Sequence, residues 1–275
     1  MESNPLEDQE YAEYWDIAAQ YWEDITTVNP YWGWKSFYSH HIPKERINIL
    51  VLGVTHGAFL KLLTSRRPQA WVCGIDISVK MLTHARKVEK KGVCCQGDEL
   101  PFKDKSFDMV LSDYFLSVLQ QDALEKTVDE VERVLRPNGV FIAKELRHRG
   151  HWVLWAAASF VVSVLCVIAA VFLPVLSVLL GALLVLTLLT YNPVTHRIGC
   201  SAFLFKWVLH VFRFAMRRRK IPTLKEMKDL CFLSRKYLHI FTDEELDHTF
   251  QDTVLDISVK TTWRSWNFSI VGEKS

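Results

Sequence analysis

Length, composition and charge exclude several classes of protein. The chain has 275 residues, of which 49% are hydrophobic and 23% are charged, so it can bury a sizeable core and is not a disordered chain. The formal net charge is +2, but residues 144–221 hold ten basic residues and only one acidic residue, Glu145. Because this basic segment also contains the most apolar stretch, a lipid partner is favoured over nucleic acid.

Aromatic side chains dominate residues 1–46, where ten of them lie between Tyr11 and Tyr38. They could pack a lid, sit at a membrane interface or cage a quaternary ammonium group, and packing is favoured. The acidic start of the chain lacks the basic region of a signal peptide, so we expect the soluble part to be cytoplasmic.

Residues 47–149 alternate between apolar runs and helical patterns. INILVL precedes a turn bounded by Gly53 and Gly57, and WVCGID precedes a second helical stretch. GVCC, FDMVLSD, a helix from about Asp122 to Leu135 and GVFIAKE continue the alternation. The pattern predicts an α/β, Rossmann-like, doubly wound and mostly parallel sheet.

Cysteine and histidine spacing argues against a metal site. The six cysteines form no CxxC pair or zinc-type cluster. Adjacent Cys94 and Cys95 lie in a short apolar run, where we expect small buried side chains. His148 and His151 have no third ligand nearby, so we predict no metal.

An uncharged run interrupts the α/β pattern in residues 150–196. Trp152 to Thr190 contains 39 positions without a charge. One helix of that length would be about 58 Å long, nearly twice the hydrocarbon core of a bilayer of about 30 Å. Pro174 divides the run, and basic residues flank both of its ends, which predicts a transmembrane or re-entrant helical hairpin with both ends in the cytoplasm.

Residues 197–236 are expected to form a basic amphipathic helix and a linker. Lys206, His210, Arg213 and Arg217 recur at helical spacing, with aromatic and aliphatic residues between them. This pattern favours a helix lying in the membrane interface, and an amphipathic helix packed on the protein is the alternative. Residues 237–275 then return to strands near Val254–Lys260 and Trp263–Val271, which should rejoin the sheet.

Several of these motifs together resemble class I S-adenosylmethionine-dependent methyltransferases that act on small molecules and lipids. WDIAAQYWED is similar to the family's lid helix, GIDIS to its second-strand motif, and GDELPFKDKSFDMVLS to its third-to-fourth-strand signature. The most specific piece is EVERVLRPNGVFIAKE, which is similar to the helix, turn and fifth strand. The resemblance covers roughly residues 11–145 and 237–271.

This resemblance implies S-adenosylmethionine as the cofactor and gives roles to individual residues. Asp76 would bind the ribose hydroxyls and Asp98 the adenine amino group. The other cofactor contacts would come from Gly53, Gly57, Ile77, Glu99 and the lid residue Tyr21. The acceptor pocket would include Asp113, Tyr114, Tyr237 and His239, among which the sequence does not choose a catalytic residue.

The glycine loop departs from the family pattern. The family has an acidic residue followed by GxGxG, whereas this chain has VLGVTHG, with Val51 in place of the acid and Thr55 in place of the middle glycine. Three hypotheses follow. The first is a methyltransferase acting on a lipid or prenylated quinone, the second a catalytically silent membrane scaffold, and the third a membrane oxidoreductase with a dinucleotide in the same turn.

Overall fold

The chain divides into two compact units. The computed structural model describes residues 5–25, 38–87, 91–119, 121–146, 197–198, 203–233, 238–239, 241–260 and 267–274. One unit comprises Met1–Glu145 and Asp243–Ser275, and the other comprises Leu146–Thr242. The predicted α/β region and its C-terminal strands therefore fall in one unit.

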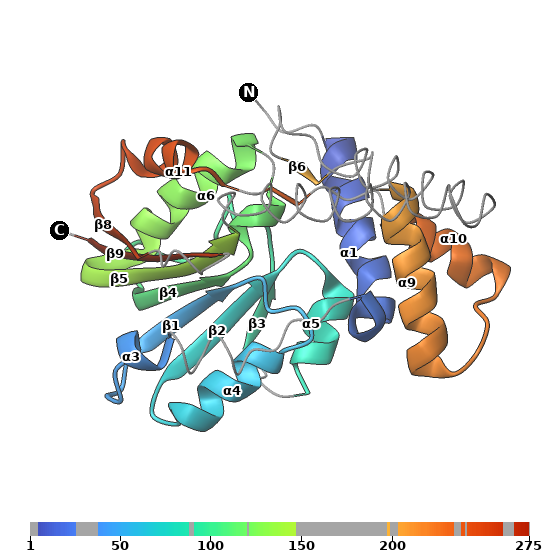
Figure 1. Cartoon of the computed structure of the whole chain (residues 1–275). Helices are drawn as coiled ribbons and strands as arrows, with labels where there is room; N and C mark the ends of the chain where they lie inside the picture. The colour runs from blue at the N-terminus through green and yellow to red at the C-terminus, as the bar shows by residue number, and fades with distance from the viewer. Residues whose placement is uncertain are drawn as a thin grey trace, which may run out of the picture. The chain divides into compact units, whose positions relative to one another are not determined.

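A seven-stranded sheet forms the larger unit, in the order β3-β2-β1-β4-β5-β9-β8 (Figure 1). The strands are β1 (Asn48–Leu52), β2 (Trp71–Asp76), β3 (Gly92–Cys94), β4 (Phe107–Asp113), β5 (Leu135–Leu146), β8 (Leu255–Lys260) and β9 (Asn267–Lys274). Neighbours among β1 to β5 are parallel, and β8 is antiparallel to β9. The predicted Rossmann-like sheet and the return of two C-terminal strands to it are confirmed.

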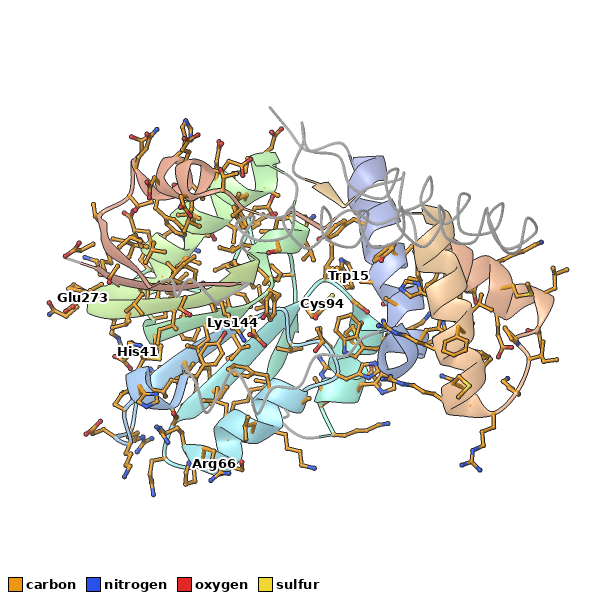
Figure 2. The ribbon with its side chains drawn as sticks, viewed as in Figure 1. Trp15, His41, Arg66, Cys94, Lys144 and Glu273 are labelled. Atoms are coloured by element: carbon orange, nitrogen blue, oxygen red, sulfur yellow. The ribbon has the colours of Figure 1, made fainter. Side chains whose placement is uncertain are left out.

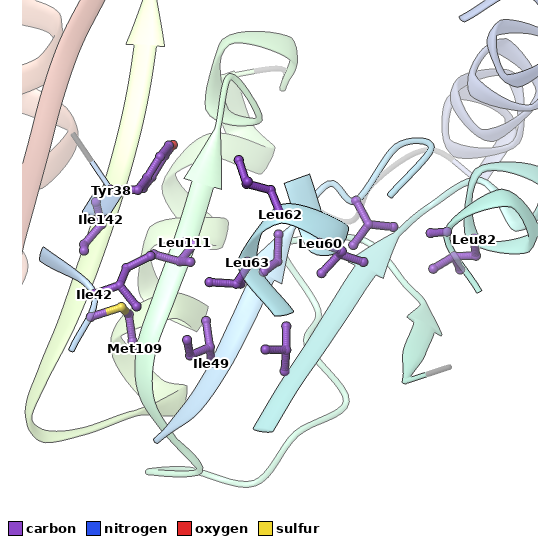
Figure 3. Packing of buried hydrophobic residues seen from close by; sticks show 14 residues of the cluster. Tyr38, Ile42, Ile49, Leu60, Leu62, Leu63, Leu82, Met109, Leu111 and Ile142 are labelled. Atoms are coloured by element: carbon purple, nitrogen blue, oxygen red, sulfur yellow. The ribbon is translucent and has the colours of Figure 1, made fainter. Parts of the chain in front are cut away.

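Helices cover both faces of this sheet (Figure 1). They are α1 (Pro5–Ile25), α3 (Ser39–His41), α4 (Ala58–Arg66), α5 (Val79–Ala85), α6 (Gln121–Val134) and α11 (Asp243–Phe250), with a 3-10 turn η2 (Leu116–Val118) after β4. Side chains alternate across a strand, so Ile49 packs with Leu60 and Leu63 of α4 on one face (Figure 3). Phe141 packs on the other face, with its ring centroid 6.1 Å from that of Phe250 in α11.

In the smaller unit, the described residues form two short strands and two helices. β6 (Arg197–Ile198) is antiparallel to β7 (Leu238–His239). α9 (Phe203–Arg218) lies where the sequence predicts a basic amphipathic helix, and α10 (Leu224–Leu233) follows it. The expectation that α9 lies in a membrane interface stays a prediction.

The predicted hydrophobic hairpin, residues 150–196, lies outside the residues that the structure describes. Within the described ranges no helix combines the length and the apolar character needed to cross a membrane. Integral membrane placement and cytoplasmic orientation therefore stay predictions.

Arg133 explains why two sequence motifs occur together. Its guanidinium donates to the carbonyl oxygens of Phe102 at 2.7 Å and Leu100 at 2.9 Å, in the loop between β3 and β4. Glu130, one turn earlier in α6, accepts from Arg133 at 2.7 Å and from the backbone N–H of Leu100 at 2.7 Å. The EVER segment thus fixes the DELPF loop, which carries the predicted adenine-binding residues.

We predict that Arg133→Ala lowers the free energy of unfolding by about 2–3 kcal/mol, because charge-assisted hydrogen bonds to two carbonyls are lost. Urea denaturation followed by circular dichroism would measure the change. Lys126→Ala is the matched control, since Lys126 is an exposed residue of the same helix and its removal should change stability by less than about 0.5 kcal/mol. Equal stability of the two variants would contradict this role.

Candidate cofactor and acceptor site

The predicted site residues of the larger unit gather at one edge of the sheet. Because β1, β2, β4 and β5 are parallel, their carboxyl ends meet at this edge. The edge carries the glycine loop after β1, Asp76 at the end of β2 and Asp113 at the end of β4. Figure 2 shows Lys144 of β5 and Cys94 of β3 on the same group of strands. Ligands of doubly wound folds bind at this edge.

The loop after β1 adopts the backbone conformation that glycines favour. Gly53 and Gly57 have φ angles of 68° and 77°. A side chain on Gly57 would lie 2.9 Å from Cα of Ala85, which is too close for a real Cβ. Thr55 also has a positive φ, 49°, which is strained for a β-branched residue. The loop therefore keeps the backbone conformation of a glycine loop although threonine stands at position 55.

Asp76 is a buried carboxylate that joins this loop to α5. One oxygen accepts the backbone N–H of Thr55 at 3.0 Å and the other accepts that of Ser78 at 3.0 Å. Burial raises the pKa of Asp76 to about 6, although both backbone donors oppose the shift. The two carboxylate oxygens of Asp76 thus lie beside the glycine loop as hydrogen-bond acceptors, where the sequence predicts ribose binding.

The remaining predicted adenine contacts lie around the ends of β2 and β3. Ile77 and Asp98 are half-buried, and Glu99 is exposed. The roles of these three residues as adenine contacts stay predictions. Cys94 is exposed, contrary to the expectation of a small buried side chain, whereas burial raises the pKa of the Cys95 thiol to about 12.

Phe115 is a residue that sequence reasoning missed. Its ring carbons lie 2.6 Å from the place of a Cβ on Gly53 and 2.9 Å from that on Gly97. The ring therefore packs between the glycine loop and the loop after β3. Any side chain at either glycine would collide with it. An aromatic residue after β4 carries no sequence signal for this contact, which depends on the tertiary arrangement of three loops.

Hydrogen bonds from three segments hold α1 against the loops of the site. Ser78 Oγ donates to Asp16 at 2.6 Å, and Tyr11 donates to the carbonyl of Val118 at 2.9 Å. Nε2 of His56 lies 2.8 Å from the carbonyl oxygen of Ala19, and since a carbonyl only accepts, Nε2 carries the proton. Tyr21, the predicted lid residue, is buried on α1 with 5% of its surface exposed.

Asp113 and Tyr114, which are predicted to line the methyl-acceptor pocket, lie at the end of β4. The buried hydroxyl of Tyr38 lies 3.0 Å from Oδ1 of Asp113, and burial raises the pKa of Asp113. Tyr114 has a φ of 61°, and Nζ of Lys144 lies 5.2 Å from the centroid of its ring. Strained backbone of this kind is frequent at functional sites.

Glu145 lies behind this pair and is fully buried. Its carboxylate accepts from Ser112 Oγ at 2.9 Å, from the N–H of Leu116 at 3.1 Å and from both the N–H and Oγ of Ser117 at 3.0 and 2.6 Å. Burial raises its pKa to about 7 in spite of these donors. Glu145 thus fixes the turn η2 that follows the acceptor residues.

The two other predicted acceptor residues, Tyr237 and His239, stay predictions. Tyr237 lies outside the described residues. His239 belongs to β7 of the smaller unit, where its backbone pairs with Arg197. The structure therefore leaves Asp113 and Tyr114 as the acceptor candidates with a defined geometry.

This fold and edge define a cofactor-binding α/β domain of the Rossmann-like type, and comparisons with known proteins identify its class. A family model described as a methyltransferase domain matches residues 50–143. A protein of Methanocaldococcus jannaschii without assigned function is 31% identical over 139 residues, which are 47% of this chain and 49% of the relative. A methyltransferase of Synechocystis sp. with no assigned substrate is 29% identical over 122 residues, which are 42% of this chain and 58% of the relative.

A solved S-adenosylmethionine-dependent methyltransferase of Methanosarcina mazei has the same fold, with a TM-score of 0.53 at 17% identity over 86% of this chain and 96% of that one. Residues 50–143 thus match a methyltransferase domain, in agreement with the predicted enzyme class and cofactor, and the likeness to the solved structure shows the shared fold. The chain spans about half the length of the curated relatives it matches.

We predict that Glu145 makes stability depend on pH. The pKa of Glu145 is about 7 in the folded chain, above the ordinary glutamate value near 4.5, so its contribution is complete below about pH 4.5 and is lost as pH rises through 7. Glu145→Gln cannot ionise, and we expect it to be less stable than the parent chain at about pH 5 because its amide faces the donors of Ser117. The difference should shrink between about pH 5 and pH 8, as measured by urea denaturation. A difference independent of pH would contradict the raised pKa.

Proposed function

We propose that the full chain is an S-adenosylmethionine-dependent methyltransferase whose acceptor is a lipid or another membrane-partitioned small molecule, such as a prenylated quinone. The observation that carries the cofactor part is the buried Asp76 carboxylate beside a left-handed glycine loop, at the carboxyl edge of a methyltransferase domain.

The residues at this edge fit the cofactor. Each oxygen of Asp76 accepts one backbone N–H, and a carboxylate oxygen has two acceptor positions, so one position on each oxygen remains for the two ribose hydroxyls. Asp98 lies on the loop that Arg133 fixes, where it can receive the adenine amino group. S-adenosylmethionine supplies an electrophilic methyl group on a sulfonium, so the protein mainly has to position the acceptor and exclude water.

Asp113 is the best candidate for handling a proton of the acceptor. It ends β4 at the same edge as Asp76, and burial raises its pKa toward the range in which a carboxylate is a useful base. The positive charge of Lys144 opposes this rise of the pKa. The ring of Tyr114, held in place by Lys144, offers the acceptor a flat apolar contact.

A membrane-partitioned acceptor is supported by chain connectivity and charge. β5 ends at Leu146, and the uncharged run begins at Trp152, only a few residues beyond the acceptor edge. Basic residues flank that run on both sides, as expected beside anionic headgroups. The membrane hairpin, the cytoplasmic orientation and the lipid partner are parts of this proposal.

A silent scaffold is the second candidate, and the strained Thr55 is the observation that favours it. A threonine in place of the family's glycine narrows the space for the amino-acid end of the cofactor. The alternative of a dinucleotide-binding oxidoreductase uses the same acidic residue at the end of β2. It does not account for the hydrogen bonds by which Arg133 fixes the DELPF loop.

We predict that Asp76→Asn weakens S-adenosylmethionine binding by tenfold or more, because hydrogen bonds to a buried carboxylate are lost. Binding to the parent chain should strengthen as pH rises through about 6, the pKa of Asp76, and binding to the variant should not follow pH in this way. Isothermal titration calorimetry at several pH values would measure both effects.

Asp129→Asn, an exposed change on α6, is the control for the Asp76 variant. NAD is titrated in parallel, and tighter binding of NAD would favour the oxidoreductase. Thr55→Gly separates the remaining cases: if only this variant binds S-adenosylmethionine, the altered loop accounts for a silent parent chain.

For the acceptor, we predict that the full chain transfers label from methyl-labelled S-adenosylmethionine into the organic phase of a membrane extract. Asp113→Asn should lower this turnover by about a hundredfold or more while leaving cofactor affinity unchanged, since a general base contributes about that factor. Asp122→Asn, an exposed change on α6, is the control. Label found only in water-soluble products would contradict the lipid acceptor.

A further inference from the structure

Four large apolar side chains are exposed around the junction of α9 and α10, two helices that follow each other in the chain (Figure 1). Phe212 and Met216 of α9 are 60% and 64% exposed, and Ile221 and Leu224 are 88% and 72% exposed. Residues four apart share a helix face, so Phe212 and Met216 form one apolar strip. Among the described residues, the other exposed large hydrophobic side chains are Trp71, Val79 and Val254. Exposed apolar surface is therefore concentrated in this short segment.

The turn at this junction is fixed by hydrogen bonds. The N–H of Thr223 donates to Glu226 at 2.7 Å, and the N–H of Glu226 lies 3.3 Å from Thr223 Oγ1, which is a capping box at the start of α10. Lys220 binds the same carboxylate at 2.7 Å. The helix pair also buries Phe214 and Leu230 completely. Some apolar side chains of α9 and α10 are thus buried, while others are kept exposed by a turn that hydrogen bonds fix.

Exposed cations accompany the apolar side chains. Arg217, Arg218, Arg219 and Lys220 are consecutive and all exposed. The segment from Phe203 to Leu233 holds eight basic residues and two acidic ones, and one of these two, Glu226, is bound by Lys220. We name residues Phe212 and 216–224 the α9–α10 tip.

We infer that the α9–α10 tip binds the surface of an anionic phospholipid bilayer. A bilayer surface satisfies both features at once, because the apolar side chains enter the headgroup boundary while arginine and lysine meet lipid phosphates. A single-stranded nucleic acid would use the cations and stack on Phe212 but leave the aliphatic Met216, Ile221 and Leu224 in water. This binding does not require methyl transfer, so it stands or falls separately from the proposed function.

Vesicle flotation of the full chain tests the inference. Vesicles of phosphatidylcholine with about one third phosphatidylglycerol are compared with pure phosphatidylcholine at about 0.1 M and 0.5 M salt. We expect binding to the anionic vesicles to be at least tenfold stronger and to weaken with salt. Arg217→Gln, Arg218→Gln and Arg219→Gln should each lower it by about fivefold. Replacing Phe212, Met216, Ile221 and Leu224 with serine should lower it by tenfold or more.

Matched changes in the other unit are the controls. Val79→Ser with Val254→Ser removes exposed apolar side chains, and Lys61→Gln with Arg66→Gln removes exposed charges. Neither pair should change binding. Tip variants that float like the parent chain, or equal binding to neutral vesicles without salt dependence, would overturn the inference.

A local readout separates the tip from the uncharged run at 152–190. A photo-crosslinking phenylalanine analogue is placed at position 212, with position 79 as the control. We expect lipid adducts from position 212 only, in anionic vesicles. Absence of adducts at 212, or equal adducts at both positions, would overturn the inference even if the chain as a whole floats.

Discussion

The carboxylate of Asp76 is the group on which the arrangement of the cofactor side depends. It accepts one backbone N–H from the glycine loop and one from the start of α5, so two segments far apart in sequence share one charge. Ser78 extends the link, because its hydroxyl donates to Asp16 of α1. Loss of a donor to a buried acceptor costs about 1 to 3 kcal/mol, more when the acceptor is charged. The loop, α5 and α1 are therefore held as one assembly.

Glu145 fixes the turn beside the predicted methyl-acceptor residues, as Asp76 fixes the loop beside the predicted cofactor site. Both are acids at strand ends, both accept backbone N–H groups from the turn that follows a neighbouring strand, and burial raises the pKa of both. Their surroundings differ in one respect. All four contacts of Glu145 come from the turn and strand behind the acceptor pair, whereas Asp76 has acceptor positions left beside the glycine loop. Glu145 is thus suited to support the turn η2, and Asp76 is suited to bind a ligand.

Sequence patterns predicted the sheet because each buried strand is a short apolar run and each turn carries glycine or an acid. They also placed Asp76 and Asp113 at strand ends, where parallel pairing brings them to one edge. Phe115, Glu145 and the pair of Arg133 with Glu130 could not be predicted as site supports, since their roles come from contacts about 30 residues away or across loops. Assigning Tyr237 and His239 to the pocket relied on the resemblance alone, and it stays a prediction.

The predicted lid helix contacts three segments around the site. α1 reaches the glycine loop through His56, the end of β2 through Asp16 and Ser78, and η2 through Tyr11 and Val118. Each link is a hydrogen bond worth about 1 kcal/mol, or about twice that where Asp16 accepts. A cofactor that stabilises the loops in this arrangement must stabilise the docked helix by the same free energy, because coupling between two sites is reciprocal. Cofactor binding and docking of α1 would therefore be coupled through these hydrogen bonds.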